Sequence, residues 1–286
     1  MSRMTQHITG TSLPASAFRL HETEGVVDVD AVFEVLGGNL AAYRIRGFVA
    51  PEVCRRIVEN FWASDQRTPR YGEGEDGVEA YLVGASHYGK PTSQYLEEAR
   101  ACEAAVANLY AGTINPASVF REALVSASGG ALKARPAMLD GVPAGDTKAV
   151  YWNNVGNFLL EPHDDLAQVK DPIQCDFEIQ QAVRVMALNI YAEVPADSGQ
   201  FKIWNVEPDD QTRDELGLSH VGFPYPAELL DEYPSIIVPV ETGDLCVANG
   251  NLAHAVLRGN PDSPKRRLLI TCFMTLNLNN ELIWWT

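Results

Sequence analysis

The stretch Phe158-Leu-Leu-Glu-Pro-His-Asp-Asp165 decides how the fold of this chain is interpreted. It is an apolar, strand-like run that ends in a proline-containing turn, with a histidine two residues before an aspartate. Residues at i and i+2 of an extended chain project to the same side, so His163 and Asp165 can converge on one ion while Asp164 faces away. The turn therefore predicts the end of a β-strand that carries two metal ligands.

A second histidine, His254, follows the turn-like Asn249-Gly-Asn251 much later in the chain and opens another strand-like run. A His-x-Asp pair with one distant histidine has the composition of a 2-His-1-carboxylate facial triad. That ligand set suits non-haem Fe(II), because it leaves one face of the metal open for a co-substrate and O₂. A lone surface histidine is more often only a polar residue, but the strand context favours His163, Asp165 and His254 as ligands.

Short strands dominate the chain from about residue 148. They are rich in β-branched or apolar residues, with Gly, Pro, Asp and Asn between most of them, and many such strands are typical of a sandwich or barrel. The expected strands cover residues 149–158, 183–191, 201–206, 236–240, 245–248, 253–257 and 267–276.

The chain before residue 148 has a different pattern. A strand is expected over 41–49, a helix with proline at its start over 51–62, and one or two further helices within 94–127. Residues 63–93 are predicted to form a long loop with short elements, and long loops in compact domains are often functional lids. We therefore expect a mainly β single domain over 1–286: a loosely ordered segment (1–25), helical support with a lid loop (26–147) and a jelly-roll or cupin-like double-stranded β-helix core (148–286).

The composition limits the classes of molecule that this chain is expected to bind. A net charge of −16 argues against nucleic acid or an anionic membrane surface as a partner. The five cysteines are dispersed, as expected for reduced thiols in a cytoplasmic protein. The polar first 16 residues do not resemble a signal peptide, and no apolar run approaches the roughly 20 residues of a membrane span. A small-molecule substrate is the expected partner, and the sequence leaves the oligomeric state open.

An arginine near the end of the barrel would bind a dicarboxylate co-substrate through a bidentate pair. The candidates are Arg266 and Arg267, and strand alternation separates them. Even positions from Leu268 to Leu276 are all apolar, as on a face packed against other structure, whereas the odd positions mix polar and apolar residues, as in a cavity lining. Arg267 is therefore predicted to point inward. The alternative is that Lys265-Arg266-Arg267 is a solvated basic turn.

Together these residues resemble the Fe(II)/2-oxoglutarate-dependent oxygenases. Three further segments carry the likeness: Tyr43-Arg-Ile-Arg-Gly-Phe-Val-Ala-Pro-Glu-Val-Cys54, Ser198-Gly-Gln-Phe-Lys-Ile-Trp-Asn205 and Gly243-Asp-Leu245. Within the superfamily the chain looks closest to the carrier-independent halogenases of hapalindole- and welwitindolinone-type alkaloids, from about residue 40 to the end. The N-succinyl amino-acid hydroxylases are similar as well.

The resemblance implies a reaction and its cofactors. Those halogenases carry glycine where this chain has Asp165, which here would fill the position that chloride occupies, so hydroxylation is expected. The implied cofactors are Fe(II), 2-oxoglutarate bound through Arg267, and O₂. The implied products are succinate, CO₂ and a hydroxylated amino acid, acylated amino acid or natural-product intermediate.

Further site residues follow from the same resemblance. The segment between the first helix and the next lines the halogenase substrate pocket, which here singles out Tyr81, Val83, His87 and Tyr88. Candidates on the strand before His163 are Phe158 and Leu160 for the substrate, and Tyr151 and Asn153 for the co-substrate. Each of these residues could equally be packing or loop surface.

Three other functions remain open at this stage. The same oxidant could desaturate or cyclise its substrate. A cupin-like metal protein would use the same barrel without 2-oxoglutarate, but cupin sites usually take three histidines and a glutamate and need no such arginine. A non-catalytic jelly-roll module would bind no stoichiometric iron.

Overall fold

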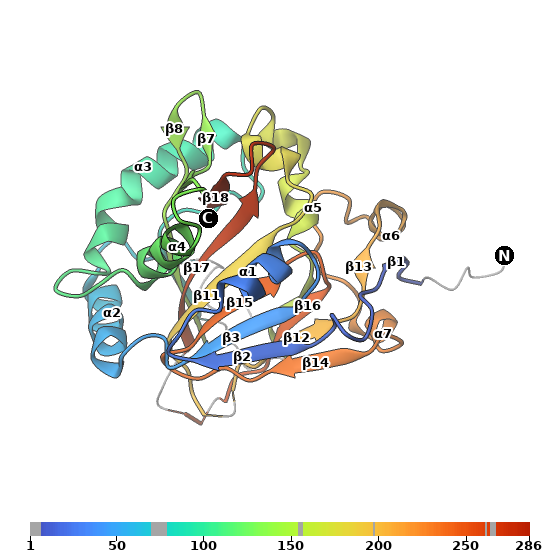
Figure 1. The fold of residues 1–286 in the computed structure, drawn as a ribbon, viewed down its shortest axis with the longest axis horizontal. Helices are drawn as coiled ribbons and strands as arrows, with labels where there is room; N and C mark the ends of the chain where they lie inside the picture. Colours follow the sequence, from blue (N-terminus) through green and yellow to red (C-terminus); the bar gives the residue numbers. More distant parts are fainter. Residues whose placement is uncertain (1–6, 70–78, 154–156, 197, 261, 264–266) are drawn as a thin grey trace.

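Two β-sheets face each other in the computed structural model, which describes residues 7–69, 79–153, 157–196, 198–260, 262–263 and 267–286 (Figure 1). The large sheet runs in the order β2 (Leu20–Glu24), β3 (Ala42–Arg46), β15 (Leu245–Asn249), β11 (Met186–Glu193), β17 (Arg267–Leu276), β9 (Lys148–Asn153), β5 (Glu79–Val83) and β4 (Thr68–Pro69), with β18 (Leu282–Trp285) on β17 and β6 (Ala134–Pro136) on β18. The small sheet runs β10 (Phe158–His163), β16 (His254–Leu257), β12 (Phe201–Trp204), β14 (Ser235–Val238).

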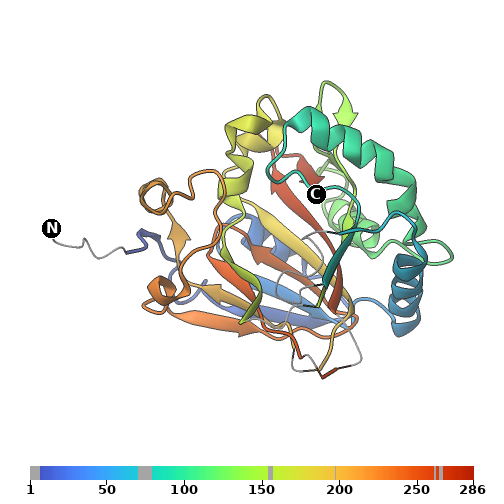
Figure 2. The same ribbon diagram turned by 180° about the vertical axis from the view of Figure 1, so that it is seen from behind.

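Helices and two short ribbons complete the described part of the chain. The helices are α1 (Val29–Leu36), α2 (Pro51–Ala63), α3 (Thr92–Asn108), α4 (Pro116–Ala127), α5 (Leu166–Val169), α6 (Asp210–Leu216) and α7 (Ala227–Leu230), with 3-10 turns at Pro172–Gln174 and Glu178–Gln181. The ribbons pair β1 (Gly10–Thr11) with β13 (Glu207–Pro208), and β7 (Met138–Leu139) with β8 (Val142–Pro143). Both views show α2, α3 and α4 gathered on one side (Figure 1 and Figure 2).

The two faces of β17 have separate partners, as its alternation predicts. Leu268, Ile270, Cys272 and Met274 pack in one core with α1, α2 and α4. Leu269 packs instead with residues of the small sheet such as Phe201 and Val256. The interior between the sheets is therefore lined by the odd positions of β17.

Two sequence predictions were wrong in the fold. Residues 149–158 were predicted as one strand, but β9 and β10 belong to different sheets. Asn153, Asn154 and Gly156 were the break signal in that run. The segment 1–25, predicted to be loosely ordered, contains β2, which pairs in parallel with β3. The predicted loop over 63–93 contains one of its expected short elements, β5, which pairs with β9. β2 and β5 are each held in the sheet by pairing with a strand from another part of the sequence. The composition of the segment itself does not reveal that pairing.

No helix in the described ranges is long and apolar enough to span a bilayer. All five cysteines fall within those ranges, and none forms a disulfide.

Candidate metal centre

Two neighbouring strands bring the predicted ligands together. His163 ends β10 and His254 begins β16, and the two residues are direct partners in the antiparallel ladder. Asp165 follows β10 at the start of α5. Asp165 Oδ1 lies 3.8 Å from His163 Nε2, and Asp165 Oδ2 lies 3.5 Å from His254 Nε2. Among the described residues, this is the single group of three or more His, Cys, Asp or Glu side chains whose donor atoms converge.

The side chains of His163, Asp165 and His254 form a cluster, to which both histidines present the same ring nitrogen, Nε2. The ring Nδ1 of His163 lies 2.8 Å from the Glu161 carbonyl, and Nδ1 of His254 lies 2.7 Å from the Leu252 carbonyl. A carbonyl only accepts, so Nδ1 carries the proton in both rings, and each ring presents the Nε2 lone pair to the other two side chains of the cluster. A backbone carbonyl that fixes the tautomer in this way is a common outer partner of metal-binding histidines.

The Asp165 carboxylate completes a donor set that requires a cation. It is buried, and Oδ2 has no hydrogen-bond partner among the described residues. Burial raises the pKa of Asp165 to about 6, although the charges of His254 and Lys148 act in the opposite direction. A buried, unpaired carboxylate oxygen facing two nitrogen lone pairs is costly unless an ion joins them. Two imidazoles and one carboxylate fit Fe(II).

The adjacent Asp164 is a structural residue. Its carboxylate is fully buried and accepts hydrogen bonds from Arg213 Nε and Nη2 at 3.2 and 3.1 Å, and from the Tyr225 hydroxyl at 2.6 Å. It also caps the backbone N–H of Ala167 at 2.9 Å. Asp164 therefore anchors the ligand loop from behind, and faces away from the cluster as its position next to Asp165 predicts.

Gly250 allows the backbone to approach the Asp165 carboxylate closely. Its carbonyl accepts the N–H of Asp165 at 2.7 Å, and its N–H donates to the Val185 carbonyl at 2.7 Å. A Cβ added at Gly250 would lie 2.5 Å from Asp165 Oδ2. The loop Asn249-Gly-Asn251, singled out in the sequence as a turn, thus closes one side of the cluster.

Two small chambers meet at the cluster. An inner chamber of about 80 Å³ lies between the sheets, and an outer chamber of about 130 Å³ lies on the other side. They share the lining residues Lys148, Leu160, His163, Asp165 and Phe273. The inner chamber alone is lined by Val150, Trp152, Ala187, Asn189, Phe201, His254, Val256, Arg267, Leu269 and Thr271. The outer chamber alone is lined by Ser86, Tyr88, Gln168 and Phe223.

Arg267 is an inward-facing charge in the inner chamber. It is 2 % exposed, and its Nε and Nη1 atoms have no hydrogen-bond partner among the described residues. Its guanidinium lies 5.3 Å from the ring centres of both Trp152 and Tyr191. Burial lowers the pKa of Arg267 from its usual value, yet a guanidinium stays charged in a protein. A buried cation with two unpaired donors makes Arg267 the candidate for binding an anion. Arg266 lies outside the described residues.

The other predicted residues divide between the pocket and its surroundings. Leu160 lines both chambers and Tyr88 lines the outer one. His87 packs its ring against Phe273 and Trp285, behind the chamber wall. Phe158 packs in a separate apolar cluster with Trp204 and Tyr225.

Tyr81, Val83 and Tyr151 were assigned to the wrong side of the sheet. All three pack in the core beneath the helices, where the Tyr151 ring lies 4.9 Å from that of Trp62. The neighbours of Tyr151 on β9 project to the opposite face of the sheet, so Val150 and Trp152 line the inner chamber instead. The side chain of Asn153 lies outside what the structure describes.

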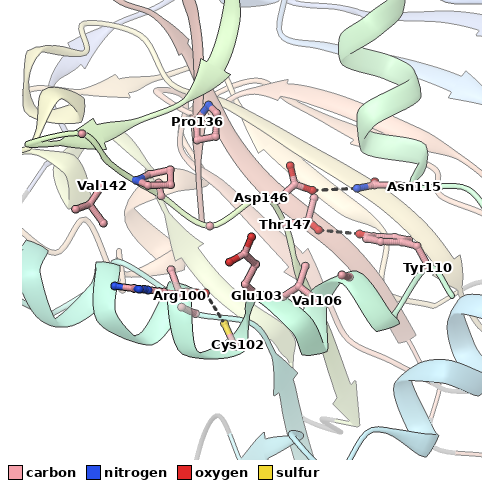
Figure 3. A pocket seen from close by; sticks show the side chains of 17 residues that line it. Arg100, Cys102, Glu103, Val106, Tyr110, Asn115, Pro136, Val142, Asp146 and Thr147 are labelled. Carbon is pink, nitrogen blue, oxygen red and sulfur yellow. Dashed lines mark hydrogen bonds between the residues drawn. The ribbon is translucent and has the colours of Figure 1, made fainter.

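A larger cavity lies away from these two chambers. It has a volume of about 700 Å³ and lies between α3, the β7–β8 ribbon and residues 143–147 (Figure 3). None of the three ligands lines it. Polar groups in its wall bond one another: the Tyr110 and Thr147 hydroxyls lie 2.7 Å apart, and Asn115 donates to Asp146 at 2.9 Å. The chemistry is therefore placed in the smaller chambers.

Comparison with known proteins agrees with this site. No family model matches the chain. It is 29 % identical to the L-isoleucine 3(1)-dioxygenase of Pantoea ananatis, over 99 % of this chain and 97 % of that protein. It is 27 % identical to the L-gamma-glutamyl-L-propargylglycine hydroxylase of Streptantibioticus cattleyicolor, over 37 % of this chain and 38 % of that protein. An N-substituted L-amino acid dioxygenase from Burkholderia ambifaria shares the fold, with a TM-score of 0.57, 14 % identity, and coverage of 97 % of this chain and 100 % of that one.

The full-length similarity to a dioxygenase supports the conclusion that the chain is an oxygenase enzyme. The converging His–Asp–His side chains are its candidate iron site, with 2-oxoglutarate as the co-substrate.

Proposed function

We propose that this oxygenase hydroxylates an unactivated C–H bond of a free aliphatic L-amino acid, consuming 2-oxoglutarate and O₂ and releasing succinate and CO₂. One observation carries the proposal: a His–Asp–His donor set lies where a small, largely apolar outer chamber meets an inner chamber that contains the buried Arg267 guanidinium, whose Nε and Nη1 have no hydrogen-bond partner among the described residues. The chain then acts as one domain over residues 1–286, with a double-stranded β-helix core.

Each chamber has its own task in this proposal. Fe(II) is held by His163, Asp165 and His254, and with 2-oxoglutarate and O₂ it supplies the oxidant that breaks the C–H bond. Arg267 pairs with the distal carboxylate of 2-oxoglutarate, because a guanidinium fork matches a carboxylate geometrically and its Nε and Nη1 donors are otherwise unused. Trp152 and Tyr191 flank this guanidinium and keep water from it.

The size and lining of the outer chamber favour a small substrate. Its volume of about 130 Å³ is close to that of an engineered cavity of roughly 150 Å³ that holds benzene. Leu160, Phe223 and Phe273 give it apolar walls, which suit an aliphatic side chain. The two named relatives and the structural neighbour act, by their names, on amino acids or their derivatives.

Asp165 directs the outcome toward hydroxylation. Its carboxylate would fill the ligand position that the resembling halogenases are expected to leave open for chloride, so hydroxylation and not halogenation is the expected outcome. Desaturation or ring formation is the alternative that the same oxidant would allow. A cupin-like metal protein without 2-oxoglutarate would have no use for the buried Arg267.

Anaerobic addition of Fe(II) and then 2-oxoglutarate tests the proposal. The chelate should give a weak visible charge-transfer band, and free L-amino acids should then stimulate O₂-dependent succinate release. Protein that binds iron but develops no band would point to the cupin-like alternative. Mass spectrometry of the product separates a gain of one oxygen from a loss of two hydrogens.

A further inference from the structure

A buried polar cluster lies directly behind the candidate metal ligands and is built around Arg213. This arginine belongs to α6 and is 5 % exposed. Its Nε and Nη2 atoms donate to the two oxygens of the Asp164 carboxylate, and Oδ2 of Asp164 also accepts a hydrogen bond from the Tyr225 hydroxyl. Because both charges lose their water, a buried ion pair of this kind is weak evidence for stability. Its place beside two metal ligands therefore suggests a role in the site.

The loop between α6 and α7 is tied to the ligand turn on both sides of His163. The backbone N–H of Asp164 donates to the Gly222 carbonyl at 3.0 Å, and the N–H of Tyr225 donates to the Pro162 carbonyl at 2.8 Å. Pro162 and Asp164 are the two chain neighbours of His163. This loop and the ligand turn are therefore one hydrogen-bonded unit, and the side-chain bonds of the arginine cluster join that unit to α6.

Phe223 lies between the two tied positions of this loop, Gly222 and Tyr225. Its ring lies edge-on to His163, with 6.3 Å between the ring centres, and it lines the outer chamber. The close approach of the loop requires glycine, because Gly222 has a φ of +61° and a Cβ there would lie 2.7 Å from the Asp164 carbonyl oxygen. The contacts that hold the loop on the ligand turn therefore also fix where the Phe223 ring stands in the chamber wall.

We propose that Arg213 is a positioning residue for substrate selection: through Asp164 it holds Phe223 in place, so that the outer chamber admits a short aliphatic side chain and excludes a larger one. The inference rests on the proposed function. Arg213 is among the lining residues of neither chamber, so it acts on the substrate through the loop. A guanidinium that bonds both oxygens of a carboxylate holds it in one geometry. Selectivity among amino acids then depends on a residue that contacts none of them.

Anaerobic calorimetry with Fe(II) and 2-oxoglutarate present measures binding without turnover. Wild type should prefer L-isoleucine over L-phenylalanine. Arg213→Met should weaken L-isoleucine binding about 5- to 10-fold and narrow that preference, while iron content and the charge-transfer band stay unchanged. In a Phe223→Ala background, Arg213→Met should change L-isoleucine affinity by less than about twofold, because the effects of two coupled residues do not add.

Arg44→Met is the matched control. Arg44 is also a buried arginine paired with a buried aspartate, Asp244, and neither residue lines a chamber. Arg44→Met removes an ion pair of the same kind, so it should cost the fold a similar amount of stability. The affinities for L-isoleucine and L-phenylalanine should nevertheless stay at their wild-type values.

Equal weakening of L-isoleucine binding by Arg213→Met with and without Phe223 would overturn the inference, because the arginine would then act on the whole fold. Loss of iron with an unchanged preference would overturn it as well, and would assign Arg213 to the metal ligands. If Arg213→Met does not fold, Tyr225→Phe decides: loss of the hydroxyl should narrow the preference about 2- to 5-fold, and no change refutes the proposal. A wild type that forms the chelate but binds neither amino acid also refutes this inference, whereas failure to form the chelate refutes the proposed function.

Discussion

The inner and outer chambers of this site are built in different ways. Arg267, Trp152, His163 and His254 in the inner chamber all project from paired strands. Of the residues that line the outer chamber alone, Ser86, Tyr88 and Phe223 lie in loops and Gln168 lies in the short helix α5. Strand register fixes the inner positions to within one residue, because a slip by one would turn each side chain to the other face. Loops vary more readily, so the inner chamber suits the shared chemistry and the outer chamber the particular substrate.

The largest effect should come from removing the carboxylate of Asp165, which lines both chambers. Asp165→Gly deletes the oxygen atoms facing both Nε2 atoms, so iron affinity and hydroxylation should fall by at least about 100-fold, beyond the 10- to 100-fold typical for outer partners of a ligand. Iron content and product formation measure both effects. Chloride or azide should perturb the optical spectrum of the variant and not of wild type. Full hydroxylation in Asp165→Gly would show that another group is the ligand.

Arg267→Met should separate co-substrate binding from metal binding. Losing a charged pair costs about 1.5–3 kcal/mol, so the KM for 2-oxoglutarate should rise about 10- to 100-fold while iron binding is retained. Steady-state succinate release against 2-oxoglutarate concentration measures this. Arg258→Met is the control, because Arg258 is exposed and nearby in the chain. If the control loses the co-substrate and Arg267→Met does not, the anion site lies elsewhere.

The sequence predicted the strand-built part of the site better than the loop-built part. Alternation along β17 placed Arg267 inward, and a turn after an apolar run placed His163 and Asp165 at a strand end. On β9 the choice of Tyr151 followed residue type and not alternation, and it fell on the wrong face. Lys148 could not be predicted, because a lysine at a strand start is ordinarily exposed.

Gly250→Ala tests whether backbone packing sets the geometry of the metal site. Gly250 has no left-handed backbone, so alanine brings little conformational strain, but its Cβ would approach Asp165 Oδ2 to 2.5 Å. Displacing the carboxylate should weaken iron binding about 10- to 100-fold, measured by competition with a chelator. Gly37→Ala is the control, since Gly37 caps α1 away from the metal. Equal iron affinity in both variants would show that the loop yields without moving Asp165.

Phe223→Ala should have the smallest effect and the most specific one. The Phe223 ring lies edge-on to His163, 6.3 Å between centres, and forms part of the outer wall alone. Its removal enlarges the outer chamber, so kcat/KM for L-isoleucine should fall about 10-fold, the lower range for lost apolar contacts in a specificity pocket, while L-phenylalanine gains relative to it. The KM for 2-oxoglutarate should stay unchanged, because the inner chamber is intact. If the KM for 2-oxoglutarate rises in Phe223→Ala as well, the two chambers are not independent. The inner chamber would then not bind the co-substrate separately from the outer chamber that binds the substrate.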